Sequence, residues 1–194
     1  MPKRSAAAAA DTRAALIAAG RSLFAEHGFA GATTGEISAR ADVTEGAFFH
    51  HFAGKKALFE AVFSELEDEL TLEARKAVSS SKASALDAFL AGCRVYLDHA
   101  ERPDFARIVM IDAPVVLGLA GWRARDSSLG LAAMIEGVEA MMGAGIVPRQ
   151  PARPLAVLIL GALNEAGLAI ARGESGVTTR GCLAALKRLL SPAK

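Results

Sequence analysis

Apolar residues recur every three or four positions along most of the chain, which is the spacing of helices that bury one face. No stretch shows the sustained alternation typical of a strand, so the pattern predicts an all-α fold. Glycine, proline and serine clusters divide the pattern into about nine helices. Their expected ranges are 11–27, 33–41, 44–52, 54–78, 84–97, 105–112, 127–142, 155–172 and 178–190.

Residues 33–52 have the pattern of two short helices joined by a tight turn. Thr33 and Glu36 form a capping box at the first helix. The second helix has an inward apolar face that leaves five residues pointing outward: Thr44, Glu45, Gly46, Phe49 and His50. A helix-turn-helix presents such residues to the major groove of DNA. Paired helices are also common as scaffolding, but an aromatic, a histidine and a glycine are unusual on a solvated face.

The helix that begins near Gly54 is too long to stay within a three-helix unit, so it must enter the rest of the chain. We therefore expect a helix-turn-helix DNA-binding domain over residues 1–58 and a second helical domain over residues 59–194. The long helix belongs to both and is a natural lever between them. The apolar second domain is expected to bind a ligand and to dimerise.

Four segments resemble the N-terminal domain of the tetracycline-repressor (TetR) family, and together they span about residues 12–60. They are FAEHGF (24–29), TTGEI (33–37), VTEGAFFHHF (43–52) and KKALF (55–59). Residues 107–118 and 122–123 are similar, more loosely, to one type of ligand domain in that family. The resemblance implies a dimeric, DNA-binding transcriptional regulator.

The resemblance also implies roles for single residues. Thr33 corresponds to a cap threonine that donates to a phosphate, and Lys55 to a phosphate-binding lysine. Phe49 and His50 correspond to the pair that faces the DNA backbone and groove. The implied DNA-contacting set is Thr33, Thr34, Thr44, Glu45, Gly46, Phe49, His50 and Lys55.

Two residues depart from the family pattern. Phe49 stands where the family often has tyrosine, so a hydroxyl donor to phosphate is missing. Glu45 stands where the family often has lysine or a small polar residue. A carboxylate repels phosphates, but it can accept a hydrogen bond from a cytosine amino group. It can equally be a solvated acid that favours the helix dipole, and both interpretations fit the sequence.

The second domain offers candidates for an effector pocket between helices. The expected pocket residues are Phe89, Cys93, Tyr96, Phe105, Met110, Trp122, Leu163 and Asn164, with His99, Asp112 and Glu165 as further polar candidates. Each apolar candidate is equally compatible with plain core packing. The last two helices are apolar on more than one face, and the family resemblance implies that they form a four-helix dimer interface.

Composition narrows the classes of function. Hydrophobic residues make up 52% of the chain, which suits a large core together with an interface or apolar pocket. The net charge is +1, and the first 56 residues hold seven Lys and Arg against five Asp and Glu. This weak excess indicates a site-specific DNA binder rather than a non-specific coat. Residues 155–171 mimic a membrane span, but Asn164 and Glu165 in their middle favour an interface helix.

Enzyme motifs are missing from the sequence. There is no phosphate-binding glycine loop, no nucleophile elbow and no metal-ligand spacing, and Cys93 and Cys182 lie far apart. We therefore expect no enzymatic activity, no metal, no cofactor and no membrane partner, and a cytoplasmic location. The start of the chain does not have the pattern of a signal peptide.

These observations together predict a dimeric regulator that binds a palindromic operator in double-stranded DNA. A small, hydrophobic effector is expected to release it, as a repressor. An activator, a regulator that needs a co-repressor and a helical dimer that does not bind DNA remain the alternatives.

Overall fold

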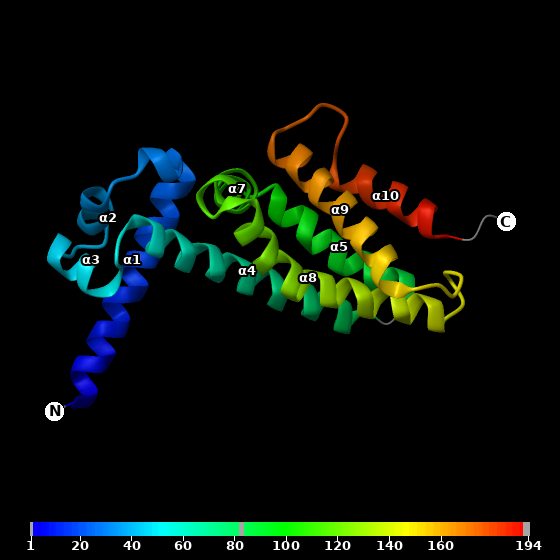
Figure 1. Cartoon of the computed structure of the whole chain (residues 1–194), viewed down its shortest axis with the longest axis horizontal. Helices are drawn as coiled ribbons and strands as arrows, with labels where there is room; N and C mark the ends of the chain where they lie inside the picture. Colours follow the sequence, from blue (N-terminus) through cyan, green and yellow to red (C-terminus); the bar gives the residue numbers. More distant parts are fainter. Residues whose placement is uncertain (1, 82–83, 192–194) are drawn as a thin grey trace.

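The computed structural model describes residues 2–81 and 84–191, with their side chains except those of residues 2–6, 119–120 and 123–129. Every regular element in these ranges is helical, which confirms the all-α prediction. Because α6, the π-helix η1 and α7 are continuous, the described residues form nine helical segments (Figure 1). The elements are α1 (Pro2–Gly31), α2 (Thr34–Arg40), α3 (Glu45–His51), α4 (Lys55–Ser80), α5 (Ala85–Ala100), α6 (Pro103–Phe105), η1 (Ala106–Asp112), α7 (Ala113–Val116), α8 (Gly118–Gly143), α9 (Ala152–Ala171) and α10 (Thr179–Leu190).

The N-terminal unit consists of α1, α2, α3 and the beginning of α4, at one end of the molecule (Figure 1). Aromatic rings fill its core: Phe24, Phe48 and Phe59 are fully buried. The rings of Phe24 and Phe59 meet edge to face at 5.3 Å, a favourable aromatic geometry. This core holds α2 and α3 at a set angle to α1.

The long helix α4 runs from this unit along the second domain, where it packs on α5 (Figure 1). Its buried residues end at Leu66, and they belong to the apolar cluster that also contains residues of α1 and η1. One apolar cluster spans the N-terminal unit and η1, and the other lies among α5, α8, α9 and α10. Tyr96 packs against both clusters, which places this ring at their junction.

α1 is interrupted at Gly28, as its sequence predicts, but the chain resumes one more helical turn up to Gly31. Gly28 has φ of +71°, a conformation that costs a non-glycine residue energy. α1 also begins at Pro2 rather than near Asp11. The alanines at 6–10, the residues with the highest helix propensity, account for this extension.

Two boundaries in the second domain also differ from the prediction. The helix expected over residues 105–112 is part of a continuous run from Pro103 to Val116. Pro114 does not end this run: it lies in α7 directly after the π-helix η1, which passes into α7 without a break. α8 begins at Gly118 instead of near 127, and Trp122 therefore lies within it.

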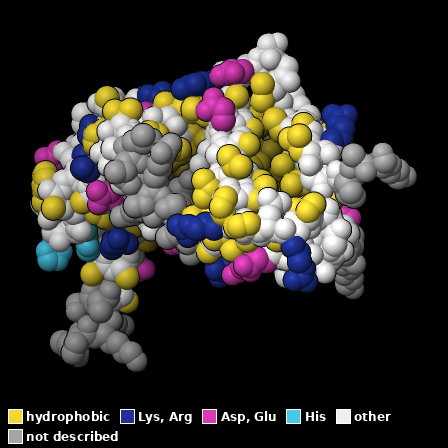
Figure 2. Space-filling model, turned by 45° about the vertical axis from the view of Figure 1, so that its right-hand side comes forward, with side chains coloured by type: hydrophobic (Ala, Val, Ile, Leu, Met, Phe, Trp, Pro, Cys, Tyr) yellow, Lys and Arg dark blue, Asp and Glu magenta, His cyan; other side chains and the backbone are white. Residues whose placement is uncertain are grey.

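One side of the α9 and α10 pair is apolar and open to solvent. Leu158 is 71% exposed and Leu189 82%, and Val157 is half exposed. Figure 2 shows hydrophobic side chains gathered over the C-terminal half of the molecule. α9 is the one described helix that is long and apolar enough to cross a membrane, and only 28% of its most apolar window is buried within the chain.

Candidate nucleic-acid interface

The first helix of the motif, α2, is closed at its start by the predicted capping box. The Glu36 N–H donates to Thr33 Oγ1 at 3.2 Å, and the Thr33 N–H donates to Glu36 Oε2 at 2.9 Å. The Thr33 hydroxyl also donates to Glu36 Oε2 at 2.7 Å, which lowers the pKa of this carboxyl. The Thr33 hydroxyl must therefore leave Glu36 before it can donate to a phosphate.

The turn between α2 and α3 sets the direction of the second helix. Asp42 takes a left-handed φ of +54°, and the Val43 N–H donates to the Ser38 carbonyl at 3.0 Å. Thr44 caps α3 by accepting from the Ala47 N–H at 3.2 Å, as predicted. These bonds hold α3 at a defined position on the N-terminal unit.

α3 presents one anchored and one open aromatic ring. Phe48 is fully buried, and its ring meets the ring of Phe49 edge to face at 5.2 Å. Phe49 is 55% exposed, and His50, Glu45 and Gly46 are also exposed. The structure thus places the expected outward residues of α3 on a single solvent-facing surface. The ring of Phe49 is therefore open to contact from outside the chain.

Lys55, the first residue of α4, is held next to this surface. Its Nζ donates to the Ala32 carbonyl at 2.7 Å and lies 4.6 Å from the centre of the Phe29 ring. The ammonium group keeps two further donors for an incoming phosphate. Thr34 is half-buried, and its carbonyl accepts from the Ser38 hydroxyl at 2.8 Å.

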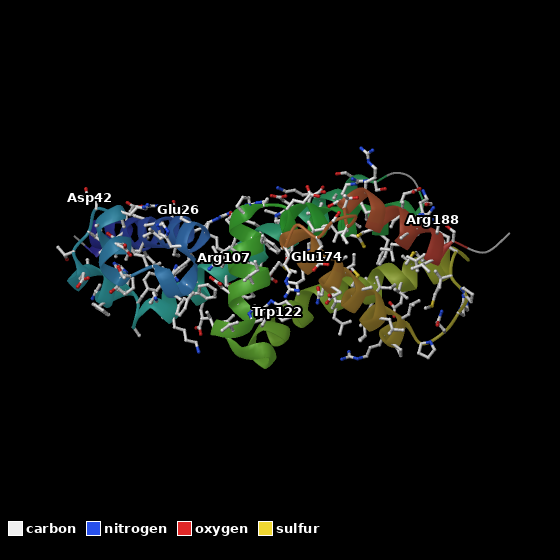
Figure 3. The ribbon with its side chains drawn as sticks, turned by 90° about the horizontal axis from the view of Figure 1, so that it is seen from above. Glu26, Asp42, Arg107, Trp122, Glu174 and Arg188 are labelled. Carbon is white, nitrogen blue, oxygen red and sulfur yellow. The ribbon has the colours of Figure 1, made fainter. Side chains whose placement is uncertain are left out.

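A polar junction, which sequence reasoning did not single out, joins the N-terminal unit to the second domain. The Phe29 N–H donates to Asp112 Oδ2 at 2.7 Å, and Arg107 Nε donates to Asp112 Oδ1 at 3.2 Å. A Cβ atom on Gly28 would collide with the Arg107 guanidinium. Figure 3 shows Arg107 where the N-terminal helices meet η1. The sequence offers two signals for this junction, Gly28 and Asp112. Neither residue type is specific to a contact between domains.

A second junction is ionic. Arg21 of α1 donates to Glu69 of α4 at 2.6 Å and to Asp104 of α6 at 2.6 Å. Arg102 joins the same two carboxylates, at 3.5 Å and 3.1 Å. The hydrogen bond from Arg21 lowers the pKa of Glu69. Burial raises the pKa of Asp104, but the hydrogen bonds from Arg21 and Arg102 outweigh it and leave this pKa below its usual value. Three helices are thereby tied together.

The structure brings four of the expected effector-pocket residues together. The Tyr96 hydroxyl donates to Asn164 Oδ1 at 2.9 Å and lies 3.7 Å from the Met110 sulfur. Its ring meets Phe105 edge to face at 6.5 Å. A Cβ on Gly167 would come within 3.1 Å of the Tyr96 ring, so α9 approaches α5 closely there.

The other expected pocket residues lie elsewhere. Phe89, Cys93 and Leu163 belong to the cluster among α5, α8, α9 and α10, and Trp122 packs against the cluster around η1. Burial raises the pKa of Cys93 to about 12, so this thiol is an inert core group. Two surface hollows, of about 390 and 520 Å³, are lined by none of the eight expected residues.

The further polar candidates have separate environments. Asp112 belongs to the junction with Phe29, and Glu165 is exposed. His99 is buried, with Nδ1 2.9 Å from the Val95 carbonyl and Nε2 3.7 Å from Glu73 Oε2. Nε2 has no hydrogen-bond partner, which is unusual for a buried polar atom. Among the described residues, no three His, Cys, Asp or Glu side chains gather as metal ligands would.

Known proteins share this architecture. A solved TetR-family transcriptional regulator from Pectobacterium atrosepticum is 33% identical, with a TM-score of 0.80 over 95% of this chain and 94% of its own. The structure of AibR in complex with isovaleryl coenzyme A and operator DNA is 20% identical, with a TM-score of 0.67 over 95% of this chain and all of its own. At that identity AibR shows a common fold alone.

Curated proteins match the N-terminal part. The transcriptional repressor BepR of Brucella suis is 34% identical over 77 residues, which are 38% of this chain and 37% of BepR. The matches to curated relatives cover between 27% and 54% of those relatives' length.

Family models match both parts of the chain. The model of bacterial regulatory proteins of the tetR family covers residues 16–62, which contain the helix-turn-helix. The model of the tetracyclin repressor-like C-terminal domain covers residues 86–193, more than half of the chain. The two matches have the order and helical content that the structure shows, and the chain therefore belongs to the TetR family of transcriptional regulators.

Proposed function

We propose that this chain is a repressor that binds a palindromic operator as a homodimer and leaves it when a small hydrophobic effector binds. The observation that carries the proposal is the solvent-facing surface of α3, where Phe49 lies exposed beside a buried Phe48. A recognition helix needs this combination, because one face must be anchored while the other enters the groove. Operator binding implies a cytoplasmic location. The name of BepR supports repression rather than activation.

The open apolar side of α9 and α10 supports dimerisation. A surface with Leu158 at 71% and Leu189 at 82% exposure is costly in water and is stabilised when a second copy covers it. A two-fold axis through this surface would relate two copies of α3, which suits an operator with two inverted half-sites. Membrane insertion of α9 would instead bring Glu165, on its exposed side, into lipid.

Release of DNA on effector binding requires structural coupling between the two domains. The buried residues of α4 share one apolar cluster with α1 and η1, and the Asp112–Phe29 hydrogen bond joins η1 to the end of α1. A ligand that favours another packing of η1 would therefore shift α1 and the spacing of the two α3 helices. Such a ligand changes DNA affinity only by its differential affinity for the two states, typically about 1–3 kcal/mol.

Tyr96, Phe105, Met110 and Asn164 are the proposed lining of the effector site, since they meet next to η1. Their chemistry suits an apolar ligand with a single polar group. Short-chain fatty acids, which combine an apolar chain with one carboxyl group, are the first class to screen, and their coenzyme A thioesters are the second, because AibR binds isovaleryl coenzyme A.

The experiment is selection of bound sequences from random DNA with the purified chain, followed by affinity measurements at several salt concentrations. We expect a palindrome that Phe49→Ala weakens at least tenfold. Lys55→Gln retains a donor for Ala32 but removes the charge, and it should reduce the salt slope by about 1 for each half-site.

Other outcomes of this selection experiment would each support one of the alternative functions. If no sequence is enriched until a ligand is added, the protein needs a co-repressor. If a folded dimer enriches nothing under any condition, it does not bind DNA. If reporter expression rises rather than falls with the bound operator, the protein is an activator.

A further inference from the structure

The N-termini of the two motif helices meet at one carboxylate. Glu45 is the first residue of α3, and Gly35 is the second residue of α2. A Cβ atom built on Gly35 would lie 2.8 Å from Glu45 Oε1, which is closer than real Cβ contacts. The carboxylate oxygen therefore occupies the space that a side chain at position 35 would take.

Two features favour this position of the carboxylate. The absent side chain of Gly35 leaves a recess on α2, and the carboxylate fills it. The backbone of Glu45 is itself fixed, because Thr44 caps α3. A glutamate without such a recess would sample many rotamers.

The location matters because this end of α3 is the end that a helix-turn-helix brings to base edges. An ionised carboxylate only accepts hydrogen bonds. It therefore suits the amino group of cytosine, and it is repelled by phosphates and by the acceptor atoms of guanine and thymine. Glu45 is exposed, so an incoming base edge can reach it.

We propose that Gly35 and Glu45 form a single specificity element, in which the recess at Gly35 positions the Glu45 carboxylate to require a cytosine at one position of each half-site. Gly35 is a positioning residue that acts through Glu45. This inference rests on the proposed operator binding by α3.

The test is operator selection with four variants. Glu45→Ala should lower discrimination for cytosine about tenfold, the loss expected for one specific base contact. Glu45→Gln should shift the preferred base at that position to adenine, since an amide pairs with adenine. Gly35→Ala should reduce the cytosine preference in the native background, and it should have no further effect when combined with Glu45→Ala.

Alanine favours a helix more than glycine does, so Gly35→Ala should not lower the melting temperature. Gly143→Ala is the matched control, because Gly143 also lies in a helix, α8, and a Cβ built on it would meet nothing within 4 Å among the described residues. It should leave the selected sequence unchanged.

Two results overturn the inference alone. One is a palindrome whose base preference is the same with Glu45→Ala. The other is a Gly35→Ala effect of equal size in both backgrounds, which would mean that Gly35 acts without Glu45. If the native chain enriches no sequence either with or without added ligand, both the proposed operator binding and this inference are wrong.

Discussion

The backbone N–H of Phe29 donates a 2.7 Å hydrogen bond to the carboxylate of Asp112, which lies 83 residues later in the chain. This bond joins the turn after Gly28, just before the DNA-binding motif, to the end of η1. Asp112 is in turn held by Arg107. Asp112 therefore links the segment just before the motif to the second domain.

Asp112→Ala should lower the free energy of unfolding by about 2 kcal/mol, because a partly buried N–H loses a charged acceptor. Asp112→Asn keeps an acceptor and should recover part of this loss. Urea denaturation measures both variants. Equal stability of Asp112→Ala and the native chain would show that the hydrogen bond contributes nothing.

Gly28→Ala should destabilise the chain by roughly 1–3 kcal/mol, because φ of 71° with ψ of 173° is a backbone conformation almost restricted to glycine, and displacing Arg107 adds a further cost. In an Arg107→Ala background only the backbone cost should remain. Gly143→Ala serves as the control, because a Cβ built on this helical glycine would meet nothing within 4 Å among the described residues. The melting temperatures of the four proteins test this prediction, which fails if Arg107→Ala leaves the Gly28→Ala effect unchanged.

Acid should weaken the ionic junction of Arg21, Glu69 and Asp104. Both carboxyls have a lowered pKa in the folded chain, so their pairing stabilises the fold above the unfolded pKa values of about 4. This stabilisation is lost as the pH falls through the folded pKa values. Arg21→Gln should therefore lower the melting temperature at pH 7 but have little effect near pH 2. The melting temperatures of the native chain and of Arg21→Gln should converge as the pH falls below about 4.

Leu158→Glu should convert a dimer into monomers, because it places a charge on the open side of α9. Leu72→Glu is a matched control, since Leu72 is 55% exposed on α4, away from that side. Sedimentation of the two variants gives the oligomeric state, and operator affinity should fall only where the dimer is lost. A dimeric Leu158→Glu protein would place the interface elsewhere.

Alanine substitutions of the adjacent residues Phe48 and Phe49 of α3 should have opposite effects on stability and on operator binding. Phe48 is fully buried, and Phe48→Ala should cost about 3–5 kcal/mol of stability. Phe49 is 55% exposed, so Phe49→Ala should leave the melting temperature nearly unchanged and weaken operator binding. Thermal melts with binding assays on folded protein separate the two effects. A large loss of stability with Phe49→Ala would make this ring structural.

Local features of the fold could be predicted from the sequence. The capping boxes at Thr33 and Ser84 and the caps at Thr44 and Thr178 are all present in the structure. These signals act over three or four residues, and a side chain bonds a backbone N–H that no helix can satisfy itself. The outward set of α3 follows from the same local periodicity.

Boundaries without a local signal were predicted less well. α8 begins nine residues before its expected start, and the run through Pro114 continues where a break was expected. Neither α7 nor α8 has a side-chain cap at its start, so the sequence carries no local signal for these boundaries. For the eight expected pocket residues, helical periodicity predicted side chains that face the interior. It did not predict which of these side chains contact one another.

The sequence by itself therefore determined the all-helical class, the helix-turn-helix and the residues it exposes, because helix periodicity and capping depend on near neighbours. Only the tertiary structure decided which distant groups meet: Phe29 with Asp112, Arg21 with Glu69 and Asp104, and Gly35 with Glu45. The physical reason is that such contacts depend on the angles and spacing at which whole helices pack. Those angles result from the burial of two apolar clusters, and no short segment of the chain encodes them.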